Sequence, residues 1–400
     1  MALSMIPRFS RDRMRRKRFL KRVTNGVLIG LISIAAAYLI TRPTGGGGFN
    51  PSETVRKALL NRSTGQTHAA NPTTSVDGND AASPIDDPVN YYGYKLRPGP
   101  YKVTEVGDIV LRDARRDKDL HVRIFYPETA GRYPVIVFSH GAGGSQNCCE
   151  ALTEHWASYG YVTIQPTHED SAVQRRDAGE ENVRFMQAVR DALKQPGLWE
   201  SRPRDVSFVL DSLGELEKRV AGLAGKIDEQ HIGVGGHSMG SFTTEAVAGA
   251  LVDLPGRPGV SFADARVKAA LCLSPQGPRQ FGLTETSFRT MHGPFLGVTG
   301  SQDSLGPMAN AVWHKQPFEL SPAGDKYHVF IEGATHLSFI TAGTLLPGKA
   351  QQAENILEYT NSVALAFWDA YLKKDTNAKA YLQSNGLASF SKGAAKVESR

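Results

Sequence analysis

Cysteine is scarce in this 400-residue chain, which has only Cys148, Cys149 and Cys272. Cys148 and Cys149 are adjacent, and this disfavours a disulfide between them on geometric grounds. We expect free buried thiols, with pairing of Cys148 or Cys149 to another molecule as the alternative. No His, Cys or acidic residues stand at metal-ligand spacing, so no metal site is predicted.

Nucleotide-binding motifs are also missing. The chain has neither G-x-G-x-x-G nor a Walker sequence, and it shows no internal repeat. A Gly-rich turn that follows a strand in this chain is therefore not interpreted as a phosphate-binding loop.

The excess of positive charge lies at the N-terminus. Residues 1–22 contain nine Lys or Arg and one Asp, a net charge of +8, whereas the whole chain is +6, so residues 23–400 carry −2. The basic balance belongs to this tail, and the remainder gives no electrostatic reason to expect nucleic acid as a partner.

Residues 23–41 contain no charged side chain, and residues 27–40 are strongly apolar. A membrane-spanning helix needs about 20 such residues, and the basic flank would keep the N-terminus in the cytoplasm. Ala35-Ala36-Ala37 also fits a signal-peptide cleavage site. Anchor and cleaved signal both stay open, and both place the rest of the chain outside the cytoplasm.

The remaining chain divides by composition. Residues 42–90 are rich in Gly, Ser, Asn, Asp and Pro and are predicted to be a flexible linker. Residues 91–385 are predicted to form one catalytic domain, and residues 386–400 a polar C-terminal tail. The sequence does not indicate an oligomeric state.

Alternating strand and helix patterns predict a doubly wound, mostly parallel α/β sheet with helices on both faces. An antiparallel hairpin precedes it. The expected strands are 108–111, 120–126, 133–139, 161–165, 232–236, 267–273, 295–299 and 327–331, and the expected helices are 151–159, 203–213, 241–251 and 355–372.

A serine stands at the turn of a strand-turn-helix pattern. The β-branched run from Ile232 ends in Gly236-His237-Ser238-Met239-Gly240, and a helix-forming segment follows. This is the G-x-S-x-G nucleophile elbow, in which the glycines are required because neighbouring chain packs too closely for side chains. Ser238 is the candidate nucleophile.

A serine nucleophile needs a base and an acid, which follow it in the order Ser, Asp or Glu, His. Asp303 follows the predicted strand 295–299, and His336 follows strand 327–331. His314 has no strand end before it and is disfavoured as the base, as are His231, His292 and His328. We predict a Ser238–His336–Asp303 triad.

A second Gly-rich turn, His140 to Gly144, leaves the buried strand 133–139. Such a turn aims backbone N–H groups into a pocket. We expect the N–H groups of Ala142 and Met239 to form the oxyanion hole.

Four further residues are candidates for the pocket: His140, His237, Trp313 and Phe339. Residues 168–202 carry an amphipathic helical pattern after a strand end, so a lid over the site and ordinary core packing are both open.

Three motifs carry a resemblance to known enzymes. Phe138-Ser139-His140-Gly141, Gly236 to Gly240 and Glu332-Gly333-Ala334-Thr335-His336 resemble the platelet-activating-factor acetylhydrolase and dienelactone-hydrolase-like branch of the α/β-hydrolases. Residues 275–278 and 302–307 are similar to stretches of cutinase-type polyester hydrolases. The resemblance covers about 135–372.

This resemblance implies a cofactor-free carboxylic ester hydrolase with an acyl-serine intermediate, acting on a small-molecule, lipid or polyester ester. In that branch the acid can follow the preceding strand, where this chain has Ser274, so Asp303 is similar to the polyester-hydrolase position instead. A peptidase, an acyltransferase or a catalytically silent, membrane-anchored binding protein on the same fold stays open.

Overall fold

The computed structural model describes residues 93–180, 183–306, 309–340 and 350–400. The predicted membrane-spanning segment 23–41 and the linker 42–90 lie outside these ranges. Within them, no helix is both long and apolar enough to cross a membrane.

The centre of the structure is a nine-stranded sheet in the order β1-β2-β4-β3-β5-β8-β9-β10-β11. The six strands from β4 to β10 run parallel, while β1, β2 and β11 pair antiparallel at the two edges. The strands are β1 (Val103–Asp113), β2 (Lys118–Pro127), β3 (Tyr133–Ser139), β4 (Val162–Thr167), β5 (Ile227–His237), β8 (Val267–Leu273), β9 (Phe295–Gln302), β10 (Lys326–Thr335) and β11 (Ala395–Ser399). A separate hairpin joins β6 (Val252–Leu254) to β7 (Arg257–Val260).

Strand β3 shows why the sheet is buried on both faces. Successive side chains of a strand point to opposite faces, so Val135 and Val137 lie in one hydrophobic cluster, while Ile136 and Phe138 lie in the other. A continuous apolar run is therefore required, as the sequence predicts.

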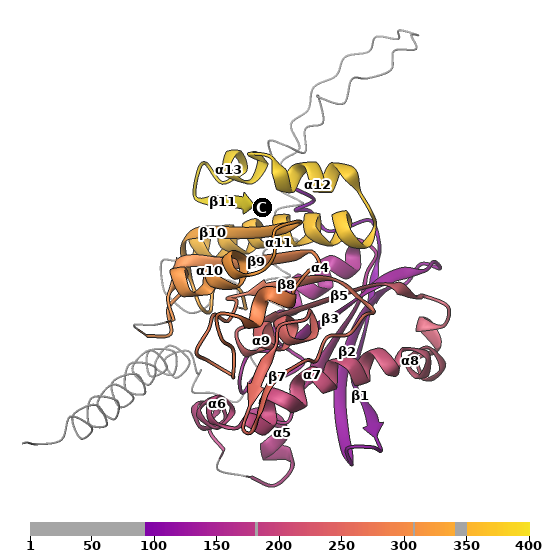
Figure 1. Cartoon of the computed structure of the whole chain (residues 1–400). Coiled ribbons are helices and arrows are strands. Elements are labelled where there is room, and N and C mark those ends of the chain that lie inside the picture. The colour runs from indigo at the N-terminus through magenta and orange to yellow at the C-terminus, as the bar shows by residue number, and fades with distance from the viewer. Residues whose placement is uncertain (1–92, 181–182, 307–308, 341–349) are drawn as a thin grey trace, which may run out of the picture.

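Helices cover the two faces (Figure 1). One face packs against α7, α8, α9 and α10, and the other packs against α4, α11 and α12. The helices are α4 (Glu150–Ser158), α5 (Ala172–Asp177), α6 (Phe185–Lys194), α7 (Pro196–Asp211), α8 (Leu213–Arg219), α9 (Met239–Val247), α10 (Ala311–Leu320), α11 (Ala350–Leu372), α12 (Thr376–Gln383) and α13 (Gly386–Phe390), with short 3₁₀ turns at Ala221–Leu223 and Ser287–Thr290.

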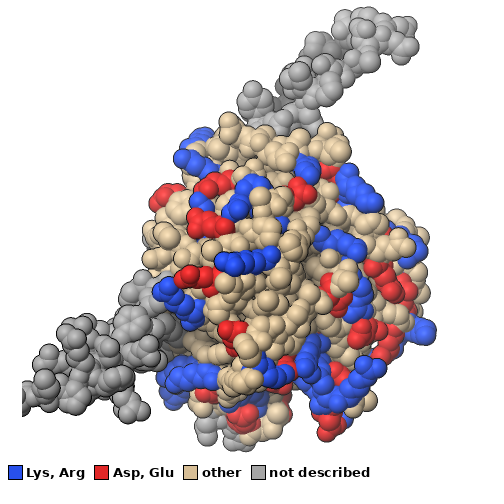
Figure 2. Space-filling view, viewed as in Figure 1, with Lys and Arg blue, Asp and Glu red and all other residues tan. Residues whose placement is uncertain are grey.

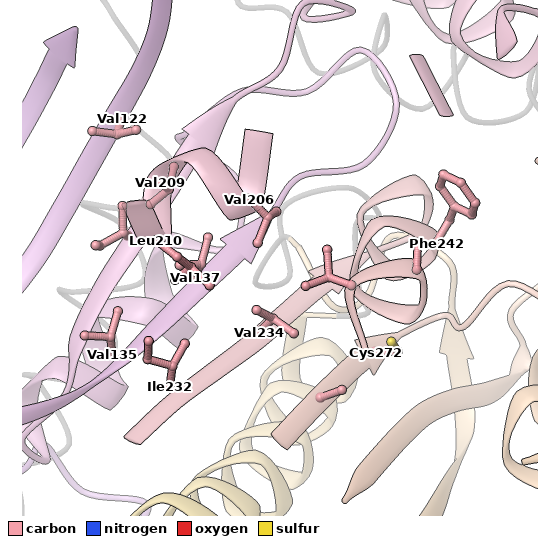
Figure 3. Packing of buried hydrophobic residues seen from close by; sticks show 14 of the residues in the cluster. Val122, Val135, Val137, Val206, Val209, Leu210, Ile232, Val234, Phe242 and Cys272 are labelled. Carbon is pink, nitrogen blue, oxygen red and sulfur yellow. The ribbon is translucent and has the colours of Figure 1, made fainter. Parts of the chain in front are cut away.

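The first cluster fixes the nucleophile helix against the sheet. Figure 3 shows Val206 and Leu210 of α7 beside Val137 and Val234 of the central strands, and Phe242 of α9 belongs to the same cluster. Phe242 and Val234 are at most 1% exposed. Burial of each such side chain contributes about 1.5–3 kcal/mol, so the start of α9 has little freedom to move.

The sequence predicts most of this architecture correctly. The expected hairpin is confirmed, since Leu111 pairs with Leu120 between β1 and β2, and each expected strand is present. The nucleophile helix is shorter than expected and ends at Val247, because Gly249 takes a positive φ of 115°.

One prediction is confirmed within a more divided segment, and one is wrong. The amphipathic helix expected within 168–202 is present as α6, and the segment also contains α5 and the start of α7, because Pro196 begins a new helix. The last residues are no tail: α13 and β11 lie within 386–400, and β11 pairs with β10. An edge strand exposes much of its surface, so its polar composition resembles that of a tail.

Charged groups of both signs are mixed on the surface. Lys and Arg lie among Asp and Glu on the face that Figure 2 shows. This agrees with the small net charge of residues 23–400 and fits the absence of an electrostatic reason for nucleic-acid binding.

Candidate active site

Ser238 stands at the C-terminal end of β5, in a strained turn that begins α9. Its φ is 57° and its ψ is −118°, a conformation that non-glycine residues rarely adopt. A Cβ on Gly236 would lie 2.2 Å from the Gly240 carbonyl oxygen, and one on Gly240 would lie 2.0 Å from the Ser139 carbonyl oxygen. Both glycines are thus required by close backbone approach, as the elbow motif predicts.

The structure brings the three predicted triad residues together. His336 Nε2 lies 2.9 Å from Ser238 Oγ, and His336 Nδ1 lies 2.8 Å from Asp303 Oδ1. An ionised carboxylate only accepts hydrogen bonds, so Nδ1 carries the proton and Nε2 is free to accept from the serine hydroxyl. Asp303 is 1% exposed and His336 is 6% exposed, whereas Ser238 is partly exposed.

Asp303 is held by groups from neighbouring strand ends. Its Oδ2 accepts hydrogen bonds from Ser274 Oγ at 2.7 Å and from Thr299 Oγ1 at 2.9 Å. Burial alone would raise the pKa of Asp303, but the contacts with His314 and His336 outweigh it and hold that pKa well below its usual range. The carboxylate is therefore ionised at neutral pH. Ser274, at the alternative acid position, serves here as a donor to the acid.

The turn after β3 leaves the N–H of the predicted second oxyanion donor, Ala142, without a hydrogen-bond acceptor among the described residues. Gly143 N–H donates to Asp170 Oδ2 at 2.8 Å, and Gly144 N–H donates to the Gly141 carbonyl at 3.0 Å. Among the described residues, no acceptor is recorded for the N–H of Ala142 or of Met239. A Cβ on Gly141 would lie 3.5 Å from Ser238 Cβ, so this turn lies directly beside the serine.

A buried ion pair fixes this turn from behind. Arg202 and Asp170 are joined at 2.7 Å, and Arg202 also donates to the carbonyl oxygens of His140 at 2.8 Å and Gly141 at 3.3 Å. Asp170 in turn accepts from Gly143. This Arg202–Asp170 clamp holds the carbonyls of the two residues before Ala142. The Gly141 carbonyl belongs to the same peptide as the Ala142 N–H, so the clamp orients that N–H.

Arg202 and His168 form the two ends of the predicted lid segment. His168 Nδ1 lies 2.8 Å from Asp205 Oδ2, and its backbone N–H donates to His140 Nε2 at 2.9 Å. Between them, α6 packs against the turn, since a Cβ on Gly143 would lie 3.2 Å from Val189 Cγ2. Both ends of the segment are thus fixed to the core; opening of its middle part stays a prediction.

The four predicted pocket residues are all buried. The ring of His140 is hydrogen-bonded to the Gly141 carbonyl of its own turn, and the ring of His237 to the His336 carbonyl. Burial lowers the pKa of His140 to about 4 and that of His237 to about 3. Trp313 Nε1 donates to the Pro278 carbonyl at 2.9 Å, and Phe339 is 1% exposed in the second core cluster. Their contact with a substrate stays a prediction.

The sequence reasoning missed His314 and Arg202. The sequence pattern disfavours His314 as the base and indicates no other role for it. In the structure His314 is completely buried, and its Nε2 lies 3.2 Å from Asp303 Oδ1. Its position inside α10 gives no signal in the sequence. Arg202 is also completely buried. Arginine is rarely buried without a partner, so the structure marks Arg202 as unusual, but no pattern in the sequence does.

Asp303, His314 and His336 each place one possible ligand atom within 4.8 Å of the others. Both nitrogens of His336 already face Ser238 and Asp303, and His314 Nδ1 lies 2.6 Å from the Pro275 carbonyl oxygen. Hydrogen bonding and ion pairing account for the cluster without a metal. The cysteines lie elsewhere: Cys149 and Cys272 are buried, Cys148 is partly exposed, and all three are free thiols.

Comparison with known proteins agrees with this geometry. The chlorophyllase family model matches residues 96–254, which include the elbow. Over 248 residues, 61% of this chain, the sequence is 27% identical to Cutinase est1 and Cutinase est2 of Thermobifida alba and 25% identical to Cutinase cut1 of Thermobifida fusca. The aligned part covers 66%, 65% and 61% of these three proteins, which is less than two thirds of the length of each.

These matches confirm the resemblance to cutinases. They do not single out the platelet-activating-factor acetylhydrolase and dienelactone-hydrolase-like branch, which stays a prediction. The parallel sheet of strands β4 to β10, with helices on both faces, is the fold expected of these relatives. In sequence and in the order of its strands and helices, the chain is similar to α/β-hydrolases, among them chlorophyllase and the Thermobifida cutinases.

Proposed function

We propose that this protein is a serine-dependent carboxylic ester hydrolase that works through an acyl-serine intermediate. One observation carries the proposal: Ser238 Oγ, His336 and Asp303 form a continuous hydrogen-bonded chain at a strained turn, beside two backbone N–H groups for which no acceptor is recorded. Nucleophile, base, acid and oxyanion donors are the parts that acyl transfer requires.

In the first half-reaction, Ser238 Oγ attacks the ester carbonyl carbon while His336 Nε2 takes the hydroxyl proton. The negative charge that develops on the carbonyl oxygen is stabilised by the N–H groups of Ala142 and Met239. His336 then gives its proton to the leaving alcohol as the carbon–oxygen bond breaks, and the acyl group remains on Ser238. Asp303 keeps the imidazole oriented throughout.

In the second half-reaction, His336 takes a proton from water, and the resulting hydroxide attacks the acyl-serine carbonyl. The same N–H groups stabilise the second tetrahedral intermediate. Its collapse returns the proton from His336 to Ser238 and releases the carboxylic acid. No step requires a metal or an organic cofactor.

The relatives support an ester as the substrate. Their names assign cutin and chlorophyll to those proteins, and both are esters. A small-molecule, lipid or polyester ester therefore suits this site, while chain length and alcohol depend on the shape of the pocket. Nothing in the site favours a peptidase or an acyltransferase specifically.

Hydrolysis of p-nitrophenyl esters from acetate to decanoate, by the full chain and by Ser238→Ala, tests the proposal. We expect turnover by the native chain and none by the variant, and a burst of p-nitrophenol when deacylation is slow. Equal inactivity on every ester would contradict it and favour a binding role.

We also propose that the domain works outside the cytoplasm, on the basis of the basic segment 1–22 and the uncharged segment 23–41. Fractionation of bacteria that express the full chain tests this. An anchored chain stays in the membrane after a carbonate wash, a cleaved one appears shortened in the periplasm, and a full-length cytoplasmic product would contradict the proposal.

A further inference from the structure

His314 faces two hydrogen-bond acceptors from opposite sides of its ring. It lies on α10 and is completely buried. Its Nδ1 is 2.6 Å from the Pro275 carbonyl oxygen, and its Nε2 is 3.2 Å from Asp303 Oδ1. Nε2 has no hydrogen bond of good geometry, so its contact with the carboxylate is that of an ion pair.

The protonation state follows from these partners. A carbonyl oxygen only accepts, so Nδ1 must carry a proton. A neutral ring would then direct the Nε2 lone pair at an ionised carboxylate, which is repulsive. Asp303 cannot relieve this by taking the proton without disturbing its other contacts, because its oxygens already accept from His336, Ser274 and Thr299.

We infer that His314 is an imidazolium ion that shares Asp303 with His336 and acts as a positioning residue for the triad. This inference rests on the proposed function for its catalytic consequence, but not for the charge itself. With both histidines in place, each carboxylate oxygen meets two donor groups, which is close to the four lone-pair sites of a carboxylate.

The other buried histidines show how unusual this is. Burial lowers the pKa of His140 and His328 to about 4 and that of His168 well below its usual range. Burial also acts to lower the pKa of His314, but the Asp303 carboxylate and the Pro275 carbonyl outweigh it, and the pKa is raised.

The groups that face His314 come from four strand ends. Asp303 follows β9, His336 follows β10, His237 ends β5 and Pro275 follows β8. The rings of His314 and His336 are stacked at an angle of 26°, with centroids 6.0 Å apart. On its own helix, Lys315 pairs with Glu398 instead. Asp303 is the only carboxylate among the described residues that contacts His314.

A positive charge at His314 has two opposing effects on the triad. It keeps Asp303 ionised and fixed, and it also disfavours a second positive charge on the stacked ring of His336. Removal of the charge at His314 is therefore expected to change how ester hydrolysis depends on pH.

The first experiment reads the charge directly. The full chain is labelled with ¹⁵N-histidine, and its ring signals are recorded by NMR from pH 5 to 9, with His314 assigned from His314→Gln. Two protonated nitrogens at pH 7 are expected. One protonated and one bare nitrogen would overturn the inference, and this result is independent of whether any ester is hydrolysed.

The second experiment reads the consequence. In His314→Gln, the acidic limb of the kcat/KM profile for a p-nitrophenyl ester should move upward by at least about one pH unit, since removal of a nearby charge shifts titration by that amount. His155→Gln is the control, because the half-buried ring of His155 also contacts a carbonyl oxygen, that of Lys95, but lies on α4, away from the triad. An unmoved limb in folded His314→Gln would overturn the positioning role; if that variant does not fold, the NMR result on the native chain decides.

Discussion

The molecule contains two serine–histidine–aspartate sets of similar geometry. The outer set is Ser238–His336–Asp303. In the inner set, His168 Nε2 lies 3.2 Å from Ser139 Oγ, and His168 Nδ1 lies 2.8 Å from Asp205 Oδ2. Judged by distances between side chains alone, the inner set also resembles a catalytic triad.

Their surroundings differ in three ways. Ser139 ends a strand and is 1% exposed, whereas Ser238 stands partly exposed on a strained turn. The inner aspartate, Asp205, is bound by Arg116 and Lys118. Burial and the positive charge of Arg202 lower the pKa of His168 well below its usual range, so His168 stays neutral.

The inner set therefore has a structural role. His168 joins Ser139 of β3 to Asp205 of α7, and its backbone N–H holds the ring of His140. These contacts support the turn that carries Ala142. A triad is defined by access and by oxyanion donors as much as by its three side chains.

Removal of the two serines gives the largest contrast. Ser238→Ala should lower kcat by about a millionfold, because the nucleophile is lost. Ser139→Ala should lower it by less than about tenfold and cost about 1 kcal/mol of unfolding free energy for one hydrogen bond. Ester hydrolysis and urea unfolding of both variants measure this. Comparable loss of kcat in the two would contradict the division of roles.

Substitution of the two aspartates comes next. Asp303→Asn should lower kcat by about 10⁴-fold with little loss of stability, since the amide presents the wrong partner to His336. Asp205→Asn should instead lower the unfolding free energy by about 3 kcal/mol, because Arg116 and Lys118 lose a buried partner. The loss stays at this low end because Arg116 keeps Asp113, and Lys118 keeps Glu169. The opposite pattern would show that the inner set, not the outer one, is catalytic.

Substitution of Arg202 in the Arg202–Asp170 ion pair should lower kcat by a smaller factor. Arg202→Lys keeps the charge but loses the fork that reaches Asp170 and two carbonyl oxygens, so the Ala142 N–H is no longer held in place. We expect kcat to fall about 10²-fold with KM nearly unchanged, the cost of one oxyanion donor.

Arg204→Lys is the matched control for that experiment. Arg204 lies two residues further along α7, with its side chain 52% exposed and paired to Glu200. Its substitution should leave kcat unchanged. If Arg202→Lys raises KM and spares kcat, the clamp shapes the substrate pocket and does not hold the oxyanion hole.

The outer set could be predicted from sequence because of how parallel sheets are built. Ser238, Asp303 and His336 each follow a strand, and the carboxyl ends of parallel strands lie at one edge of the sheet. A strand can be recognised from its local pattern, so residues that follow strands are brought together by the fold alone. Only their order along the chain was then needed.

The supporting residues lack such a rule. His314 and Arg202 lie inside helices, and what each one contacts depends on how α10 and α7 lie on the sheet. Helix α7 itself was expected to begin at Pro203, a residue that usually starts a helix rather than occupying its interior. Strand β11 has the composition of a tail, and only pairing with β10 makes it a strand.

The smallest effect distinguishes the two regions by their response to acid. His140 and His168 in the inner region stay neutral in the folded protein, while in the unfolded chain they bind protons below their ordinary pKa of about 6.5. The unfolded state thus binds more protons, and the unfolding free energy falls as the pH drops from about 6.5 toward 4. Asp303 and His314 carry opposite charges and respond to pH in opposite directions. The contribution of Asp303 to the unfolding free energy is lost only when the pH falls toward its lowered pKa. That of His314 is lost only when the pH rises through its raised pKa.

Urea unfolding at pH 4.5 to 7 compares the native chain with His140→Gln. Each histidine that is neutral when folded adds up to about 1.4 kcal/mol per pH unit to the slope in this range. The variant should be less stable at pH 7 but show a slope that is shallower by about one proton, because burial lowers the pKa of His140 to about 4. An unchanged slope would mean that His140 is charged in the folded protein. The loss of stability in acid would then come from His168 and not from His140.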